Sequence, residues 1–65
     1  METLHNGRYC AEYGNCADGP ILVITRPRGG GKHLIGDAAI EWAEHIRTAL
    51  DKSEANALCR AILEA

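Results

Sequence analysis

The sequence lacks phenylalanine and is poor in large aromatic side chains, since Tyr9, Tyr13 and Trp42 are its only large rings. Hydrophobic residues make up 46% of the 65 residues, but ten of them are alanine, so bulky apolar side chains are few. A chain of this length forms one domain at most, and its small core leaves it marginally stable alone. We therefore expect one small domain over residues 1–65, stabilised by a homodimer or by an obligate partner.

Signals for secretion and for membrane insertion are also absent. The segment from Met1 to Gly7 is polar, whereas a signal peptide has an apolar core. No apolar run approaches the ~20 residues that span a bilayer. Three cysteines, an odd number, argue against a secreted disulfide scaffold. We expect a soluble cytoplasmic protein that does not contact a membrane.

The hydrophobic pattern changes near Gly36. Before it, short apolar runs are broken by glycine, which is typical of strands; after it, apolar residues recur at helical spacing. The predicted fold class is therefore α+β, a two- or three-stranded antiparallel sheet followed by two helices. The predicted elements are a frayed or loosely pairing start over 1–6, strands over 8–13, 21–25 and 33–35, a hairpin loop over 14–20, and helices capped by Asp37 and Ser53.

The segment from Ile21 to Thr25 is apolar on both faces, so we expect it to be the central strand or to be covered on both sides. In a chain without phenylalanine, Trp42 is expected to be a core ring, although an exposed tryptophan would be an anchor for a partner. The residues expected to dominate the core are Ile21, Leu22, Val23, Ile24, Ile46, Leu50, Leu58 and Ile62.

Basic residues cluster around three glycines, as Arg26, Arg28 and Lys32. The spacing is not that of a P-loop, since Arg26 stands where a glycine is required and His33 where a serine or threonine is required. The plainer interpretation is a solvated hairpin tip. The alternative is a contact loop for a partner, or a small nucleic-acid-binding module built on the Arg26–Lys32 loop. Nucleic acid is the less favoured partner because the net charge is −2.

Acidic residues recur along the first predicted helix, as Asp37, Glu41, Glu44 and Asp51. The plainer interpretation is a solvated outer face. The functional interpretation is a surface that docks on a basic partner, where complementary charge raises the association rate and sets specificity. The residues predicted to bind a partner are therefore Asp37, Glu41, Glu44, Asp51, Arg26, Arg28 and Lys32.

Residues that bind metals or act as nucleophiles are present, but their spacing matches no common site. There is no CxxC and no HxxxH pattern. Cys10 and Cys16 flank the predicted hairpin end. The plainer interpretation is that they are ordinary small thiols, buried or half-buried, and the alternatives are a disulfide, a zinc site or a redox element. Cys59 falls on the apolar stripe of the second helix and is expected in the core. We expect no catalytic residues, no metal and no cofactor.

The segments Gly7-Arg8-Tyr9 and Ile21-Leu22-Val23, with Ala43-Glu44-His45-Ile46 and Ala49-Leu50 in the first helix, resemble small phage- and mobile-element-encoded accessory proteins of the anti-CRISPR type. The resemblance implies a non-enzymatic, protein-binding inhibitor in the host cytoplasm. Such an inhibitor would cover a site on a larger host protein or nucleoprotein complex. The resemblance carries no catalytic motif and assigns no site residue.

Overall fold

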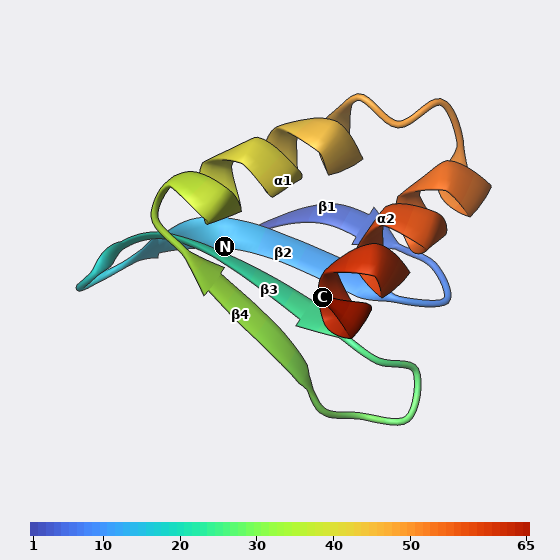
Figure 1. Cartoon of the computed structure of the whole chain (residues 1–65), viewed down its shortest axis with the longest axis horizontal. Helices are drawn as coiled ribbons and strands as arrows, with labels where there is room; N and C mark the ends of the chain where they lie inside the picture. Colours follow the sequence, from blue (N-terminus) through green and yellow to red (C-terminus); the bar gives the residue numbers. More distant parts are fainter.

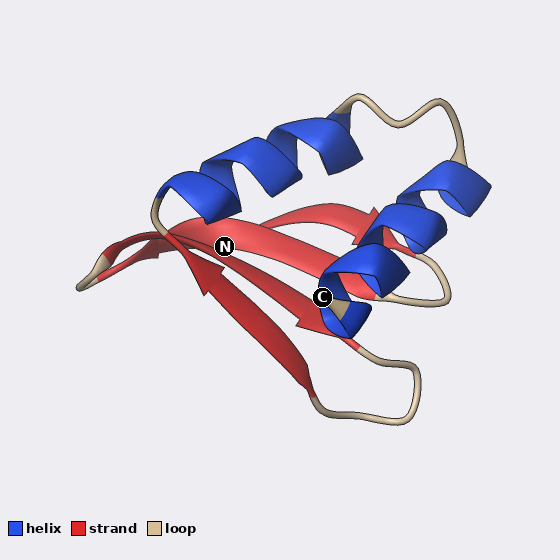
Figure 2. Ribbon diagram, in the orientation of Figure 1, coloured by secondary structure: helices blue, strands red, loops and turns tan.

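The computed structural model describes residues 1–65 and shows a four-stranded antiparallel sheet followed by two helices. The strands lie side by side in chain order, and both helices cover the same face of the sheet (Figures 1 and 2). The predicted α+β class is confirmed, with one strand more than expected. The elements are β1 (Glu2–Asn6), β2 (Cys10–Cys16), β3 (Gly19–Thr25), β4 (Gly31–Ile35), α1 (Asp37–Arg47) and α2 (Lys52–Glu64).

The start of the chain, which was expected to be frayed or to pair loosely, forms β1 and pairs with β2 along its length. Thr3 lies opposite Glu12 and Asn6 opposite Cys10, with an irregularity between Thr3 and His5. The segment contains one large apolar residue, Leu4, so its sequence shows no alternating pattern. Hydrogen bonding to the edge of a sheet formed elsewhere gives this segment its strand structure.

The predicted hairpin loop over 14–20 was also too long. The ladder between β2 and β3 continues to the pair of Cys16 and Gly19, which leaves Ala17 and Asp18 as a two-residue connection. Gly19 has φ 112°, a left-handed value that glycine adopts without strain. Gly14 and Asn15 are turn formers by propensity, but cross-strand pairing holds them in β2.

The core lies between one face of the sheet and the two helices. β3 is an interior strand, as predicted, and its Leu22 and Ile24 are fully buried against the helices. Ile21 and Val23 point to the opposite face and are only half-buried, while Leu58 packs against the edge of the core. The buried apolar cluster consists of Ala11, Leu22, Ile24, Ala39, Ala43, Ile46, Cys59 and Ile62.

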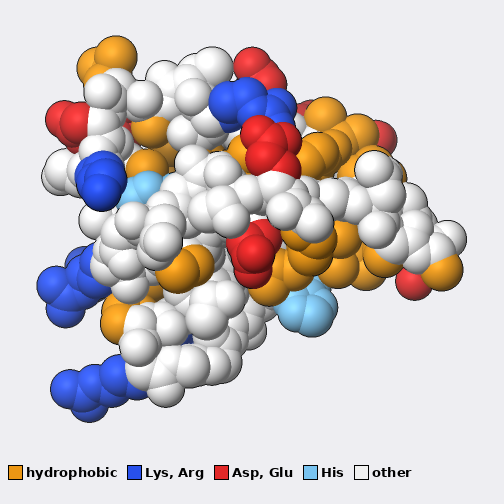
Figure 3. Space-filling model, turned by 180° about the vertical axis from the view of Figure 1, so that it is seen from behind, with side chains coloured by type: hydrophobic (Ala, Val, Ile, Leu, Met, Phe, Trp, Pro, Cys, Tyr) orange, Lys and Arg blue, Asp and Glu red, His pale blue; other side chains and the backbone are white.

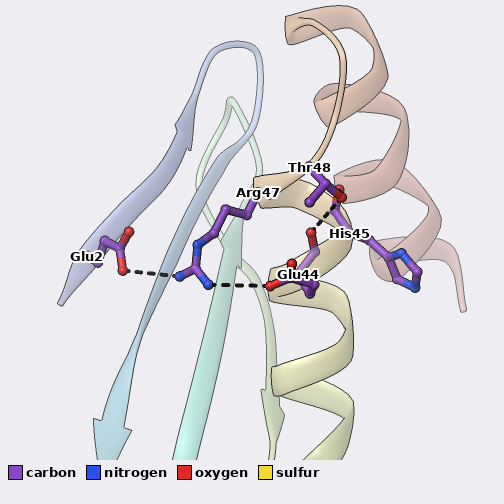
Figure 4. A network of polar contacts seen from close by, with 5 residues as sticks. All are labelled: Glu2, Glu44, His45, Arg47 and Thr48. Carbon is purple, nitrogen blue, oxygen red and sulfur yellow. Dashed lines mark hydrogen bonds and ion pairs between the residues drawn. The ribbon is translucent and has the colours of Figure 1, made fainter.

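Helix α1 starts where predicted but without a side-chain cap. The capping position is Gly36, with φ 81°, and Asp37 is the first helical residue. The helix ends at Arg47, after which the Thr48 hydroxyl donates to the Glu44 carbonyl at 2.9 Å (Figure 4). Because the helix stops there, Leu50 does not lie on the buried face of α1, which carries Ala39, Ala43 and Ile46. Leu50 is 91% exposed, so its predicted core position was wrong.

Helix α2 is capped by Asp51 and not by Ser53. The Asp51 carboxylate accepts the Glu54 N–H at 2.8 Å, and the Glu54 carboxylate accepts the Leu50 N–H at 2.6 Å. The Asp-x-x-Glu spacing is that of a capping box, but the Glu54 carboxylate binds the N–H of the residue before the cap and not that of Asp51 itself. The predicted apolar stripe of the helix is confirmed by the burial of Ala55, Cys59 and Ile62. Neither helix is both long enough and apolar enough to cross a membrane.

Candidate binding groove

The largest hollow on the surface, about 630 Å³, is lined by the β1–β2 turn and α2. A second hollow of about 410 Å³ lies between these segments and the loop that joins β3 to β4. Arg8, Tyr9, Arg60 and Glu64 line both hollows, so the two form one open groove. We call it the arginine groove, because its charged lining is Arg8, Arg26, Arg28, Arg60 and Glu64.

Two hydrogen bonds to one amide oxygen fix the β1–β2 side of the groove. The Oδ1 atom of Asn56 accepts the backbone N–H of Tyr9 at 3.2 Å and lies 2.7 Å from Nε2 of His5. Because this oxygen is an acceptor, Nε2 of His5 carries the hydrogen and donates it. His5 is 7% exposed, and Tyr9 packs against the core. The turn that carries Arg8 is therefore held against α2.

The β3–β4 side of the groove is a closed loop. The Arg26 N–H donates to the Gly30 carbonyl at 2.9 Å, and the Gly29 N–H donates to the Arg26 carbonyl at 3.1 Å. Gly29 and Gly30 both have positive φ, which permits this tight path. Arg26 and Arg28 are exposed at its surface. Lysine and arginine side chains accordingly project from one edge of the molecule in Figure 3.

The groove carries an excess of positive charge. Arg60 contacts Glu64 at 3.2 Å within α2, whereas Arg8, Arg26 and Arg28 form no ion pair. A guanidinium group binds carboxylate or phosphate through two parallel hydrogen bonds. Three such groups without an internal partner make this groove the part of the surface best suited to an anionic ligand.

Lys32 does not line the groove with Arg26 and Arg28, although the three were predicted to act together. Its Nζ atom donates to the Ala65 carbonyl at 3.0 Å and to the Ile62 carbonyl at 3.4 Å. A cation at the C-terminal end of a helix satisfies free carbonyls and complements the helix dipole. Lys32 thus ties β4 to the end of α2.

The four acidic residues predicted to bind a partner are all exposed, but two of them have structural contacts. Asp51 caps α2, and Glu44 lies 3.7 Å from Arg47. Arg47 also contacts Glu2 of β1 at 3.2 Å (Figure 4). Only Asp37 and Glu41 are free of ion pairs and capping bonds, so they form a shorter acidic surface than the sequence suggested.

The cysteines do not come together. Cys10 and Cys16 are the first and last residues of β2, so six residues of extended chain, roughly 20 Å, separate them. This distance excludes a disulfide between them within one chain and a shared metal ion. Cys59 is fully buried, and burial, with a smaller contribution from the charge of Cys10, raises its thiol pKa to about 11.

Other predicted positions are accounted for by packing. Trp42 is half-buried against the core, and its ring meets that of His45 edge-on, with centroids 5.7 Å apart. No group of three or more His, Cys, Asp or Glu side chains lies close enough together to hold a metal ion. Comparison with protein-family models, curated proteins and solved structures found no match.

The sequence did not predict that Arg8, Tyr9, Asn56 and Arg60 form parts of one site. Asn6-Gly7 is a strong hairpin signal, and it would have placed Arg8 and Tyr9 at a turn. Asn56, Arg60 and Glu64 recur at a spacing of four, which gives one polar face of α2. No local pattern shows that this face meets the two loops, because that depends on how α2 crosses the sheet.

Proposed function

We propose that this protein acts by binding, without catalysis, as an inhibitor that covers a site on a larger protein or nucleoprotein complex. This is the function that the resemblance to small phage-encoded accessory proteins implies. The observation that best supports it is the convergence of Arg8, Arg26 and Arg28 on an open groove, with no ion-pair partner for any of them. The groove is the main contact, and it meets an acidic surface of the partner.

The way in which the groove is held supports this assignment. Arg8 stands on a turn that Asn56 fixes, and Arg26 starts a loop closed by its own backbone hydrogen bonds. Ordered loops lose less conformational entropy when they bind, so more of the interaction free energy remains as affinity. Exposed arginines that stabilise nothing within the chain are free to bind carboxylates of another molecule.

The free acidic residues of α1 supply a second, weaker contact. Asp37 and Glu41 lie on a different element from the arginines, so the molecule presents two surfaces of opposite charge. A partner with the complementary arrangement binds in a single orientation. Charge at the rim of an interface chiefly changes the association rate and its salt dependence.

The test is affinity capture of interacting proteins, followed by direct binding to the captured partner. Arg26→Glu with Arg28→Glu is compared with Asp37→Lys with Glu41→Lys, so that each double variant reverses two exposed charges that form no ion pair within the chain. We expect the arginine variant to lose about tenfold or more in affinity and the acidic variant to lose less. Inhibition of the partner's activity should fall in the same order. Binding that neither variant changes would contradict the proposal.

A second candidate function is nucleic-acid binding, and the specific observation in its favour is Tyr9. Tyr9 lines the groove among the arginines, and an aromatic ring beside guanidinium groups is a platform on which bases of single strands stack. Fluorescence anisotropy with a labelled single-stranded oligonucleotide at about 50 and 200 mM salt tests it. Binding that falls steeply with salt, and that Arg28→Ala weakens, supports this candidate; no binding at low salt excludes it.

A further inference from the structure

One whole face of the sheet is left uncovered by the helices. Figure 1 shows both helices in front of the sheet, and Figure 3 shows the molecule from behind, with hydrophobic side chains gathered beside exposed backbone. We call this surface the open face. Strand alternation and register assign to it Thr3, Asn6, Cys10, Glu12, Gly14, Ile21, Val23, Thr25, Gly31, His33 and Ile35.

The open face is more apolar than a solvated sheet surface needs to be. Ile35 is 47% exposed, and Ile21 and Val23 are only half-buried. Met1 lies over Gly14, since a Cβ added to that glycine would be 3.0 Å from the Met1 side chain, and Met1 is itself 68% exposed. The apolar side of β3 that points away from the helices therefore has no cover within the chain.

From the arrangement of charge and apolar side chains on this face, we propose that two copies of the chain form a symmetric dimer by packing their open faces together. The two-fold axis runs parallel to β3 and lies between the two sheets. β3 of one copy then lies over β3 of the other, and β2 of each copy lies over β4 of its partner. Stacked sheets pack about 10 Å apart with interdigitating side chains.

The charged row of the face is self-complementary under this axis. Glu12, Val23 and His33 lie side by side across β2, β3 and β4. Rotation about the axis reverses the row, so Glu12 of each copy faces His33 of the other and the two Val23 side chains meet. The carboxylate thus finds an imidazole N–H donor twice in each dimer.

The neighbouring row supplies apolar contacts. Gly14, Ile21 and Ile35 lie side by side in the same order of strands. Reversal sets Ile35 of each copy over Gly14 of the other, where it meets the Met1 side chain that lies over this glycine. The two Ile21 side chains meet on the axis. The row of each copy therefore faces apolar side chains of the other.

A two-fold axis perpendicular to the strands gives a poorer fit. It lays each strand over its own equivalent, so Glu12 on β2 never faces His33 on β4 of the other copy. Where such an axis passes through this row, Glu12 meets Glu12, and like charges placed directly opposite one another are unfavourable. The order of Glu12, Val23 and His33 across the sheet thus favours the axis parallel to β3.

The face is small, so the dimer is weak. The open face has fewer residues than the roughly 20–30 that each partner contributes to an interface of standard size. Dimerisation is therefore concentration-dependent. It leaves the arginine groove accessible, because the groove is lined by α2 and by the loops at one end of the sheet. The inference is independent of the proposed function.

Sedimentation equilibrium of the whole chain over a range of concentrations tests the dimer. Ile35→Lys is compared with Ile40→Lys, since both isoleucines are 47% exposed but Ile40 lies on α1, on the other side of the sheet. We expect Ile35→Lys to weaken dimerisation about tenfold or more and Ile40→Lys to leave it unchanged. A wild-type chain that stays monomeric at millimolar concentration, or equal effects of the two substitutions, would overturn the proposal.

A charge exchange tests the axis. Glu12→Lys removes the carboxylate that faces His33, and His33→Glu places two carboxylates opposite one another. Each substitution should therefore weaken the dimer. The double variant, which exchanges the two charges, should recover most of the lost affinity. Circular dichroism establishes that each variant is folded. A double variant as weak as the single ones, in folded protein, would refute the Glu12–His33 contact and with it the proposed axis.

Discussion

His5 and Asn56 are 51 positions apart in the chain, yet Nε2 of His5 lies 2.7 Å from Oδ1 of Asn56. The same oxygen accepts the backbone N–H of Tyr9 at 3.2 Å. One amide side chain therefore joins β1, the turn after it and α2. A buried polar group that keeps its partner contributes modestly to stability, but one that loses its partner is costly. The contact holds the edge strand and also shapes the arginine groove.

Asn56→Ala should destabilise the protein because it leaves the His5 ring and the Tyr9 N–H without their acceptor. We expect a loss of about 1–3 kcal/mol in the free energy of unfolding, measured by urea denaturation. Asn56→Asp is the matched control, since it keeps an oxygen at the same position and should lose less. Equal losses in the two variants would show that the acceptor does not matter.

The alternation of apolar residues explains which parts of the fold were predictable. β3 and the stripe of α2 place Leu22, Ile24, Cys59 and Ile62 in the core because their own periodicity matches the face that they bury. β1 could not be predicted in the same way, since its only large apolar residue is Leu4 and its pairing with β2 makes it a strand. The arginine groove could not be predicted for a related reason. Its lining residues come from separate segments of the chain, which come together only in the folded structure.

The core position of Leu50 was predicted wrongly because helical periodicity does not show where a helix ends. In the sequence, Leu50 continues the helical spacing of the apolar residues Ala39, Ala43 and Ile46. The helix α1 ends at Arg47, however, and the hydroxyl of Thr48 donates a hydrogen bond to the Glu44 carbonyl. Thr48 is a residue whose side chain competes for backbone carbonyls, and this signal for a helix end was present in the sequence. A residue beyond the end of the helix no longer shares its face.

Leu50→Lys and Ile46→Ala should therefore have very different effects on stability. Leu50 is 91% exposed, and its replacement should change the free energy of unfolding by less than about 0.5 kcal/mol. Ile46 is 3% exposed, and its truncation should cost about 2–4 kcal/mol, since it leaves a cavity in a small core. Thermal and urea unfolding of both variants would measure the difference. Strong destabilisation by Leu50→Lys would mean that the leucine is buried in solution, for example in an assembly.

Gly31→Ala should be severely destabilising because β4 passes very close to β3 at this position. A Cβ there would clash with the carbonyl oxygen of Ile24, which is backbone and cannot move aside without breaking the ladder. Gly14→Ala is the matched control, since its Cβ would meet only Met1, with the flexible side chain nearest at 3.0 Å and the Met1 Cα in ordinary contact at 3.5 Å. We expect Gly31→Ala to lose at least about 2 kcal/mol and Gly14→Ala much less, by urea denaturation. Comparable losses would contradict the close approach of the two strands.

Stability should fall in alkaline solution because of the Cys59 thiol. Burial, and to a lesser degree the charge of Cys10, raises its pKa from 9.0 to about 11 in the folded protein. Between these two values the unfolded chain has lost the proton and the folded chain retains it, so rising pH favours unfolding. The contribution is intact below pH 9 and amounts to about 1 kcal/mol of lost stability by pH 10. Urea denaturation under reducing conditions should show this loss in the wild type but not in Cys59→Ala, which serves as the control for tyrosine and lysine titration. Parallel pH profiles for the two proteins would mean that Cys59 ionises as readily in the folded chain as in the unfolded one.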